Sequence, residues 1–275
     1  MFTKGCPLRC KWCQNPESQK GRAEVAFYVE KCTNCNRCVE VCPANAIDPI
    51  TKISDYSKCV ACGKCVEVCE NDARKMIGQT KPVDEVVSEL LKDIDFYKDS
   101  EGGVTFSGGE PLLYPEFLLE VIQLLKKSSI HVNIETCGQF DFARLTPLLP
   151  FVDMIYFDLK LMDGKKHKNF TGVENNVILD NFKRLNRVFR PVQARIPLIP
   201  GINDDHDNIR ATCEFLLDEG HQTVHLLPYH SMGNSKAKRI DFRTKIFKVA
   251  PYDKSQIEKI KTKFSSFGIK AITYD

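Results

Sequence analysis

Three cysteines lie close together near the start of the chain, in the segment GCPLRCKWCQNPES at residues 5–18. Cys6, Cys10 and Cys13 have the spacing C-x3-C-x2-C. Such a set could form disulfides, bind zinc or hold an iron–sulfur cluster. Three thiolates leave one iron of a [4Fe–4S] cluster without a protein ligand, and an open coordination position distinguishes catalytic metal centres from closed structural ones. The spacing therefore points to a cluster that takes part in chemistry.

The composition indicates a cytoplasmic protein whose thiols stay reduced. The chain has 275 residues, of which 43% are apolar and 13 are cysteines. Its first ten residues lack the apolar core of a signal peptide, and no run reaches the ~18 apolar residues of a membrane helix. Disulfides are rare in the cytosol, so this many cysteines predicts metal binding. The formal charge is +3 and the basic residues are scattered, which predicts neither a nucleic-acid nor a membrane partner.

A second cysteine pattern occurs twice. CTNCNRCVEVCP (32–43) and CVACGKCVEVCE (59–70) both have the spacing C-x2-C-x2-C-x3-C, which is that of bacterial ferredoxins with two clusters. In this arrangement the fourth cysteine of each run crosses to the other cluster. A pair of zinc sites would need a longer spacer between its cysteine pairs, so iron–sulfur is favoured, although Glu70 stands where proline is usual. The predicted ligand sets are Cys32, Cys35, Cys38 and Cys69 for one cluster, and Cys59, Cys62, Cys65 and Cys42 for the other.

The rest of the chain alternates between strand and helix patterns, which predicts an α/β fold with a parallel sheet, either barrel-like or doubly wound. We interpret the double cysteine repeat as an insert in this domain. We therefore expect residues 1–21 to begin the main domain, 22–80 to form a ferredoxin-like insert and 81–275 to complete the main domain. The expected strands are Gly103–Ser107, His131–Glu135, Met154–Lys160, Val192–Pro197, Thr223–Pro228 and Ile269–Tyr274, and the expected helices are Asp84–Tyr97, Pro115–Lys127, Asn175–Val188, Asp205–Glu219 and Lys254–Phe267.

Polar residues and glycines recur where the expected strands end. In parallel α/β folds, sites form at the carboxyl ends of the strands. Asp158 and Lys160 are two residues apart, so both point to one face of their strand. One charged pair alone would more often be structural, but polar residues or glycines at the ends of five expected strands predict a site at this edge. The residues concerned are Gly108, Gly109, Glu110, Glu135, Asp158, Lys160, Arg195 and His230.

Together these motifs resemble a known family. The C-x3-C-x2-C loop, with Trp12 before its last cysteine, resembles the signature of radical S-adenosylmethionine (SAM) enzymes, and SGGEP (107–111) resembles their SAM-amino-group loop. More narrowly, KGCPLRCKWCQNPES, GGVTFSGGEPLL, IETCG, YFDLKLMD, RIPLIPGIND and HLLPYH resemble the activating enzymes of glycyl radical enzymes, the pyruvate formate-lyase activating enzyme family, in its ferredoxin-bearing branch. The resemblance implies a partial (β/α)6-type radical SAM barrel carrying an inserted two-cluster ferredoxin-like domain.

The resemblance also implies a reaction. One electron from the catalytic cluster would cleave SAM to methionine and a 5′-deoxyadenosyl radical, which takes a hydrogen from a backbone glycine of a partner glycyl radical enzyme of the formate-lyase or dehydratase type. The implied cofactors are SAM and three [4Fe–4S] clusters, one catalytic and two auxiliary. The implied electron donor is flavodoxin or ferredoxin, and the implied oligomeric state is a monomer.

Residue roles follow from the resemblance only. The catalytic set would be Cys6, Cys10, Cys13, Lys160 and Arg195. Gly108, Gly109 and Glu110, together with Glu135, would hold the SAM amino group, although the best-known member of the family has aspartate in place of Glu135. Lys160 and His230 would meet the SAM carboxylate, and Asp158 the ribose or a monovalent cation. Trp12 and Arg195 would also border SAM.

Two other functions stay open from the sequence. An electron-transfer protein would use the double cysteine repeat alone and would not cleave SAM. A radical SAM enzyme acting on a small molecule would cleave SAM without taking hydrogen from a partner glycine.

The start of the chain carries one further expectation. The family places a β-strand before the cluster loop, whereas only Met1–Lys4 precede Gly5 here. Strands usually have five or six residues, so we expect a truncated N-terminus and an open edge on the neighbouring strand.

Overall fold

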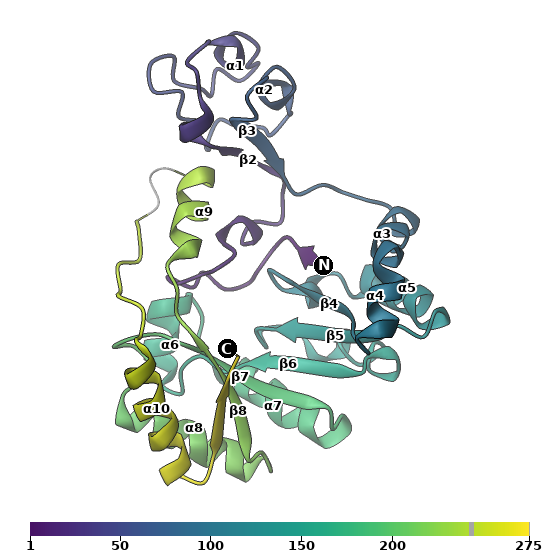
Figure 1. Cartoon of the computed structure of the whole chain (residues 1–275), viewed down its shortest axis with the longest axis vertical. Helices are drawn as coiled ribbons and strands as arrows, with labels where there is room; N and C mark the ends of the chain where they lie inside the picture. The colour runs from purple at the N-terminus through teal and green to yellow at the C-terminus, as the bar shows by residue number, and fades with distance from the viewer. Residues whose placement is uncertain (242–244, 275) are drawn as a thin grey trace.

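The computed structural model describes residues 1–241 and 245–274, and its main body is one parallel sheet (Figure 1). The strand order is β1-β4-β5-β6-β7-β8-β9, so each strand lies beside the next one of the sheet in sequence. This confirms the α/β fold with a parallel sheet. The strands are β1 Phe2–Thr3, β4 Gly103–Gly108, β5 His131–Thr136, β6 Met154–Asp158, β7 Val192–Leu198, β8 Thr223–Pro228 and β9 Lys270–Thr273.

Alternation along the strands separates the core from the site. In β6, Ile155 and Phe157 are buried, whereas Tyr156 and Asp158 point to the other face. Since successive side chains alternate across a strand, one face of the sheet packs under helices while the other lines a hollow. The large core cluster includes the buried faces of β4 to β8 together with residues of the covering helices.

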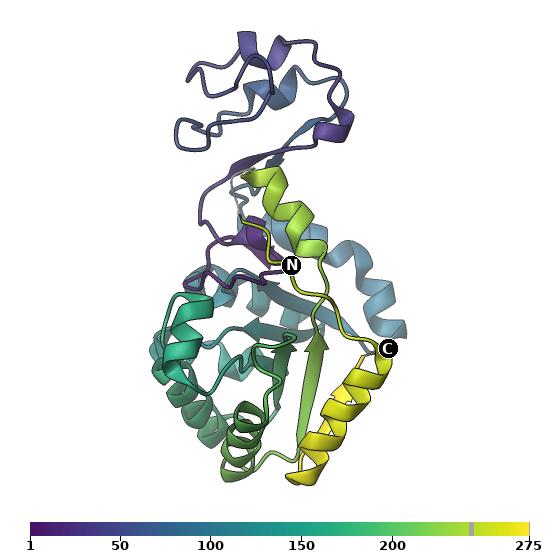
Figure 2. The same cartoon turned by 90° about the vertical axis from the view of Figure 1, so that its left-hand side faces the viewer.

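Helices cover the outer face of the sheet, as both views show (Figures 1 and 2). In α5, for example, Leu118, Val121, Ile122 and Leu125 are all buried, the i, i+3, i+4 and i+7 stripe of an amphipathic helix. The expected helix Asp84–Tyr97 is divided into α3, a short 3-10 turn at Leu91–Asp93, and α4, and two helices, α6 and α9, were not expected. The helices are α3 Val83–Leu90, α4 Ile94–Asp99, α5 Pro115–Lys127, α6 Gly164–Thr171, α7 Asn176–Val188, α8 His206–Asp218, α9 Met232–Ile240 and α10 Lys254–Ser266.

The two residues of β1 cover part of the edge that was expected to be open. Phe2 pairs with Ser107 and Thr3 with Gly108 in parallel register. The Met1 ammonium group donates to the Thr105 carbonyl at 2.7 Å, and the Ser107 amide donates to the Met1 carbonyl at 2.9 Å. The end of β4 that leads into the glycine loop is therefore tied to the start of the chain.

A cysteine-rich lobe, whose elements lie within residues 24–77, projects from the sheet at the top of Figure 1. Its base is the antiparallel pair β2 (Glu24–Phe27) and β3 (Arg74–Ile77), and above it lie two one-turn helices, α1 (Arg37–Glu40) and α2 (Lys64–Glu67). Within the described residues, no helix is long and apolar enough to cross a membrane.

Helix α9 lies between the lobe and the sheet in both views. At its C-terminal end, the Tyr56 hydroxyl donates to the Arg239 carbonyl at 3.0 Å, and Arg239 forms an ion pair with Glu30 at 3.1 Å. At its N-terminal end, Gly233 packs directly on the cysteine loop, the segment of residues 5–18 that carries Cys6, Cys10 and Cys13. A Cβ at this position would lie 2.3 Å from the Cys13 carbonyl oxygen. One helix therefore contacts both cysteine-bearing regions.

Candidate active site

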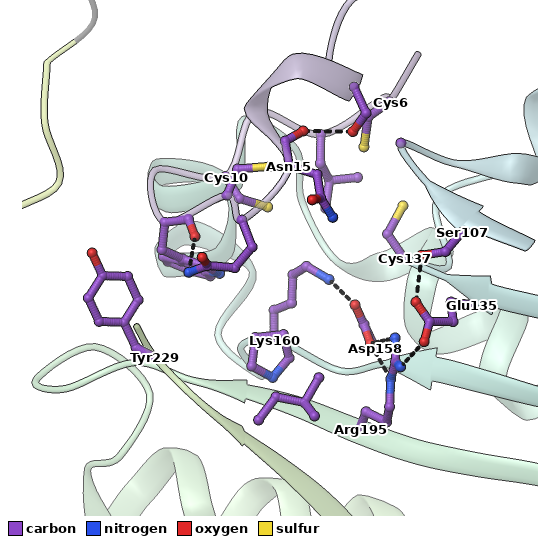
Figure 3. A pocket seen from close by; sticks show the side chains of 18 of the residues that line it. Cys6, Cys10, Asn15, Ser107, Glu135, Cys137, Asp158, Lys160, Arg195 and Tyr229 are labelled. Carbon is purple, nitrogen blue, oxygen red and sulfur yellow. Dashed lines mark hydrogen bonds and ion pairs between the residues drawn. The ribbon is translucent and has the colours of Figure 1, made fainter. Parts of the chain in front are cut away.

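A cavity of about 440 Å³ lies at the carboxyl edge of the sheet, under the loop of residues 5–21 (Figure 3). Figure 3 shows Cys6 and Cys10 entering from the loop, while Glu135, Asp158, Lys160 and Arg195 come from the strand ends on the opposite side. The sequence prediction that these distant residues meet at one edge agrees with this geometry. The predicted residues that line the cavity are Cys6, Cys10, Trp12, Cys13, Gly108, Gly109, Glu135, Asp158, Lys160, Arg195 and His230.

The cysteine loop is held by backbone contacts on both sides. The Gly5 amide donates to the Ser18 carbonyl at 2.7 Å, which closes the loop at its base. On the other side, the Arg9 amide donates to the Thr171 carbonyl at 2.6 Å, at the end of α6. The Cys13 amide donates to the Cys10 carbonyl at 3.2 Å and forms the turn that brings these two cysteines together.

Gly109 is required by the close approach of two chain segments. A Cβ at this position would lie 1.9 Å from the Gly5 carbonyl oxygen. That same oxygen accepts a hydrogen bond from the Glu110 amide at 2.7 Å. Since only glycine permits such an approach, the glycines after β4 allow this loop to lie against the base of the cysteine loop.

The three loop thiols differ in their acidity. The Cys137 thiol donates to Cys6 and lowers the pKa of Cys6 to about 7. Burial raises the pKa of Cys10 to about 12 and also raises that of Cys13. Because ligands bind metal as thiolates, binding a cluster here must release protons from Cys10 and Cys13.

The donor set fits a cluster better than a single ion. Within residues 1–241 and 245–274, no three His, Cys, Asp or Glu side chains converge on a point where one metal ion would sit. A [4Fe–4S] cluster binds each thiolate at a different iron, so its ligands stand apart around it. Three thiols on one loop, spread over one wall of a cavity, match that requirement.

Cys137, two residues after Glu135, also lines the cavity. It is buried, and its amide donates to the Glu110 carboxylate at 2.8 Å. The hydrogen bond to Cys6, burial and the negative Glu110 all raise the pKa of Cys137 well above its ordinary value. Cys137 therefore stays protonated beside Cys6 and acts as a donor to it.

Asp158 stands between two cations at the floor of the cavity. It accepts from Lys160 Nζ at 3.1 Å and from Arg195 Nε at 3.1 Å. Burial works to raise the pKa of Asp158, but the two cations outweigh it and hold the pKa below its ordinary value. Burial would lower the pKa values of Lys160 and Arg195, yet Asp158 and other acidic neighbours raise both. All three groups are therefore charged at neutral pH.

Glu135 completes this network on the side of β4. It forms an ion pair with Arg195 at 2.5 Å and accepts a hydrogen bond from the Ser107 hydroxyl. Arg195 thus links Glu135 and Asp158, and its guanidinium also lies 5.0 Å from the centre of the Tyr156 ring. Two anions and two cations in one network leave no net charge on this floor.

Glu110 does not line the cavity. Its side chain is 0% exposed, and its carboxylate accepts from the Thr136 hydroxyl and from the amides of Cys137 and Leu112. Burial raises its pKa against the effect of these hydrogen bonds. The side chain thus ties the glycine loop after β4 to the end of β5, and its oxygens face the protein interior.

Two residues that sequence reasoning missed support the cavity: Gln14, which lines it, and Asn203, which does not. The buried Asn203 donates to the carbonyls of Lys160 and Pro197, both at 2.8 Å, and so fixes the ends of β6 and β7 together. Gln14 donates to the His230 carbonyl at 2.8 Å and joins the cysteine loop to the end of β8. Gln14 lies in the motif KGCPLRCKWCQNPES and Asn203 in RIPLIPGIND, but the sequence does not show their hydrogen-bond partners, which include residues distant in the chain.

The eight lobe cysteines gather in two separate sets around two small cavities. The membership of each set is the one predicted from the crossed ferredoxin pattern. One cavity is lined by Cys32, Cys35, Cys38 and Cys69, and the other by Cys42, Cys59, Cys62 and Cys65.

Comparisons with known proteins agree with this geometry. A sequence model of the radical SAM superfamily matches residues 1–215. The trans-4-hydroxy-L-proline dehydratase activating enzyme of Clostridioides difficile is 42% identical over 277 residues, which cover 98% of this chain and 92% of that protein. The chain belongs to the radical SAM activating enzymes of glycyl radical enzymes. Two more members of this family are similar: the isethionate sulfite-lyase activating enzyme of Oleidesulfovibrio alaskensis (41% identity, 88% of this chain and 81% of that protein) and the benzylsuccinate synthase activating enzyme of Thauera aromatica (40%, 94% and 81%).

Solved structures support the fold of this activating enzyme. A crystallised domain of a pyruvate-formate lyase-activating enzyme from Bacteroides vulgatus is 31% identical and has a TM-score of 0.53, covering 63% of this chain and 99% of that one. Streptococcus suis SuiB bound to its precursor peptide SuiA has a TM-score of 0.58 over 99% of this chain and 47% of that one, at 15% identity. The second likeness concerns the fold alone.

Proposed function

We propose that this activating enzyme holds its catalytic [4Fe–4S] cluster on Cys6, Cys10 and Cys13, binds SAM in the 440 Å³ cavity and takes a hydrogen from a backbone glycine of a partner glycyl radical enzyme. One observation carries the proposal: three loop thiols and a network of charged strand-end residues line the same cavity. When bound, the cluster supplies one electron and an open iron at which SAM is cleaved to methionine and the 5′-deoxyadenosyl radical.

The charges on the cavity floor suit the methionine end of SAM. Its amino group needs an anion or acceptors, which Glu135 and the backbone of Gly108 and Gly109 supply from one side. Its carboxylate needs a cation, and Lys160, whose pKa is raised, stays charged there. His230 lies at the rim and adds a second donor for the carboxylate.

In this proposal, Asp158 and Arg195 hold neighbouring charged side chains in position. Asp158 keeps Lys160 and Arg195 in place and presents its carboxylate to the ribose or to a monovalent cation. Arg195 orients Glu135 through their ion pair. The Glu110 side chain does not contact SAM in this proposal. Its buried carboxylate holds the glycine loop in position, and the backbone of that loop contacts SAM.

The lobe carries two auxiliary [4Fe–4S] clusters in this proposal, one on each cysteine set. Four thiols around each cavity saturate a cubane, so neither cluster has an open iron for SAM. Their role is electron transfer from flavodoxin or ferredoxin. The chain works as a monomer in the cytoplasm, where a reducing environment keeps eleven ligand thiols available.

The partner is a glycyl radical enzyme of the formate-lyase or dehydratase type. Relatives named for a dehydratase, a sulfite-lyase and a synthase match with 40–42% identity, so overall similarity favours none of these partners. A glycyl radical enzyme encoded beside the gene is the first candidate.

The test uses the reconstituted, reduced protein with SAM and a partner whose glycines carry deuterium at Cα. We expect a glycyl radical in the electron paramagnetic resonance (EPR) spectrum and deuterium in the 5′-deoxyadenosine formed. Cleavage of SAM without deuterium transfer from any candidate partner would favour a small-molecule substrate. Reduction of an acceptor without any cleavage of SAM would favour the electron-transfer function.

A further inference from the structure

Two buried cations in the lobe line the first of its two cysteine cavities. The Arg74 side chain on β3 is 2% exposed, and Lys52, which follows the turn at residues 49–51 between the two cysteine runs, is 4% exposed. Both line the cavity of the first cysteine set, which consists of Cys32, Cys35, Cys38 and Cys69.

Neither cation has an anionic partner among the described residues. The Arg74 guanidinium donates to the Ser54 hydroxyl at 2.9 Å and to the Lys52 carbonyl, and it lies 4.6 Å from the centre of the Phe27 ring. The Lys52 ammonium group donates to the Pro49 carbonyl. No carboxylate of residues 1–241 or 245–274 forms an ion pair with either group.

The nearby carboxylates have other partners. The Asp48 carboxylate, which senses the charge of Lys52, accepts from the amides of Ile50 and Thr51 and is exposed. Glu24 is paired with Lys4 and Lys20 on the other side of the lobe base. Burying a charge is costly unless it is paired, so two unpaired buried cations need an explanation.

The second cavity has a different lining. Besides its four cysteines it is bordered by apolar residues, a glycine and Ser54, and no charged side chain is among them. Arg74 does not line this cavity, but it donates to Ser54, which does. Burial raises the pKa of Cys65 in this set to about 11 and outweighs the effect of Arg74, which lowers it. Two sites with the same ligands thus differ in the charge around them.

An iron–sulfur cluster would supply the missing negative charge. Four thiolates around a core of about +2 carry a net charge of about −2, and one added electron makes it about −3. A buried cation stabilises the more negative, reduced form and so raises the reduction potential. Arg37 also lies near Cys35, but it is exposed and paired with Glu70, so its effect is screened.

We propose that Arg74 and Lys52 are the counter-charges of the cluster on the first cysteine set, and that they hold its reduction potential above that of the second lobe cluster. This inference rests on the proposed function in assigning clusters to the lobe. An electron that enters the lobe then resides at the first site in preference to the second. The two cysteine sets supply the same four ligands, but the clusters on them differ in reduction potential.

The test uses the full chain with Cys6, Cys10 and Cys13 replaced by alanine, so that only the lobe clusters contribute to the EPR signal. Arg74→Met removes the buried charge and Arg74→Lys keeps it. Lys75→Met is the matched control, because it removes one charge at the next position of β3, where the side chain is exposed beside Asp72. A Cys35→Ser variant identifies the signal of the first cluster. Iron content and both midpoint potentials are measured for each variant.

We expect Arg74→Met to shift the first potential to a more negative value and the second by less, because Arg74 lines only the first of the two cavities. Arg74→Lys should recover most of the shift, and Lys75→Met should change neither potential. Selective loss of about four irons in Arg74→Met, but not in Arg74→Lys, would also support the inference. An unchanged first potential in Arg74→Met, or equal iron loss in both Arg74 variants, would overturn it.

Iron content separates this inference from the assignment on which it rests. The triple-alanine chain should hold about eight irons if the lobe carries two clusters. Near-zero iron in that chain would refute both the lobe clusters and the role of Arg74. About eight irons with equal potentials would refute the role of Arg74 alone.

Discussion

Buried cations have anionic partners in the cavity at the sheet edge, whereas those described in the cysteine-rich lobe have neutral ones. In the cavity, Lys160 and Arg195 are matched by Asp158 and Glu135, so the charges cancel and a space of about 440 Å³ is left open. In the lobe, the hydrogen-bond partners of Arg74 and Lys52 among residues 1–241 and 245–274 are neutral, and the cysteines enclose much smaller spaces. The first arrangement suits a zwitterionic substrate that enters and leaves, and the second suits a resident anionic group.

The strongest challenge to this comparison is to remove cysteines from each region in turn. Cys10→Ala should lose about four of about twelve irons and all cleavage of SAM, because the cluster with the open iron is gone. Cys62→Ser should also lose about four irons, but it should slow turnover with little change in SAM affinity. Iron analysis, SAM binding and 5′-deoxyadenosine formation measure this. If Cys62→Ser lost SAM binding while its catalytic cluster stayed intact, the division of roles would be wrong.

Gly233→Ala tests the helix that joins the two regions. The new Cβ would lie 2.3 Å from the Cys13 carbonyl oxygen, so either α9 or the cysteine loop must shift. A displacement of about 1 Å at a reacting centre costs on the order of 100-fold in rate, and we expect a loss of that order in SAM cleavage. Ser235→Ala, on the exposed side of the same helix, is the control. Full activity of Gly233→Ala would show that this contact does not position the loop.

Asp158→Asn tests whether the charges on the cavity floor are matched, as the comparison requires. The substitution removes the negative charge that Lys160 and Arg195 share. Breaking a buried ion pair lowers the free energy of unfolding by about 3 kcal/mol. Because the folded pKa of Asp158 lies below its ordinary value of 3.8, its contribution is fully present above that pH and disappears as the pH falls through the folded pKa.

The measurement for Asp158→Asn is urea unfolding of the metal-free, reduced chain at several pH values. The difference between wild type and variant should be constant from pH 7 to about 4 and shrink at lower pH. A difference that shrank between pH 7 and 5 would mean that Asp158 is not held as an anion by its two neighbours.

The smallest effect is expected at the far end of α9. Arg239 pairs with Glu30 of the lobe, and both side chains are partly exposed. Exposed ion pairs contribute about 0–1 kcal/mol, so Arg239→Met should change unfolding free energy by less than about 1 kcal/mol and leave SAM affinity unchanged. Thermal unfolding and a SAM titration check this. A larger effect would mean that the lobe depends on this helix for its placement.

Much of the site could be read from local patterns. The strand periodicity located β4 to β9 within one or two residues, and the rule that sites form at strand ends brought Glu135, Asp158 and Arg195 together. The repeat spacing also divided the lobe cysteines into the two sets that the structure forms. These features depend on short-range regularities, which a single sequence displays.

The rest depends on partners that are distant in the chain. Glu110 looked like a ligand-facing residue, but its oxygens are taken by Thr136 and Cys137 at the end of the next strand. The helices α6 and α9 are polar in composition (GKKHKNFT and MGNSKAKRI), and few of their buried residues are large and apolar, so their helical signal in the sequence is weak. Helix α9 packs on both the cysteine loop and the lobe, and the pattern of its own residues does not show these distant partners.

The pairing of β1 with β4 has a consequence for how the protein is made. The Met1 ammonium group and the Thr105 carbonyl that it contacts are 104 positions apart, and the whole lobe lies between them. Since a chain emerges from the ribosome with its N-terminus first and domains fold as units during synthesis, the lobe is complete before the strand that anchors residues 1–3 exists. The contacts between residues 1–3 and β4 can therefore form only after β4 has been translated. All eight cysteines of the two clusters proposed for the lobe are synthesised before the strand that holds residues 1–3.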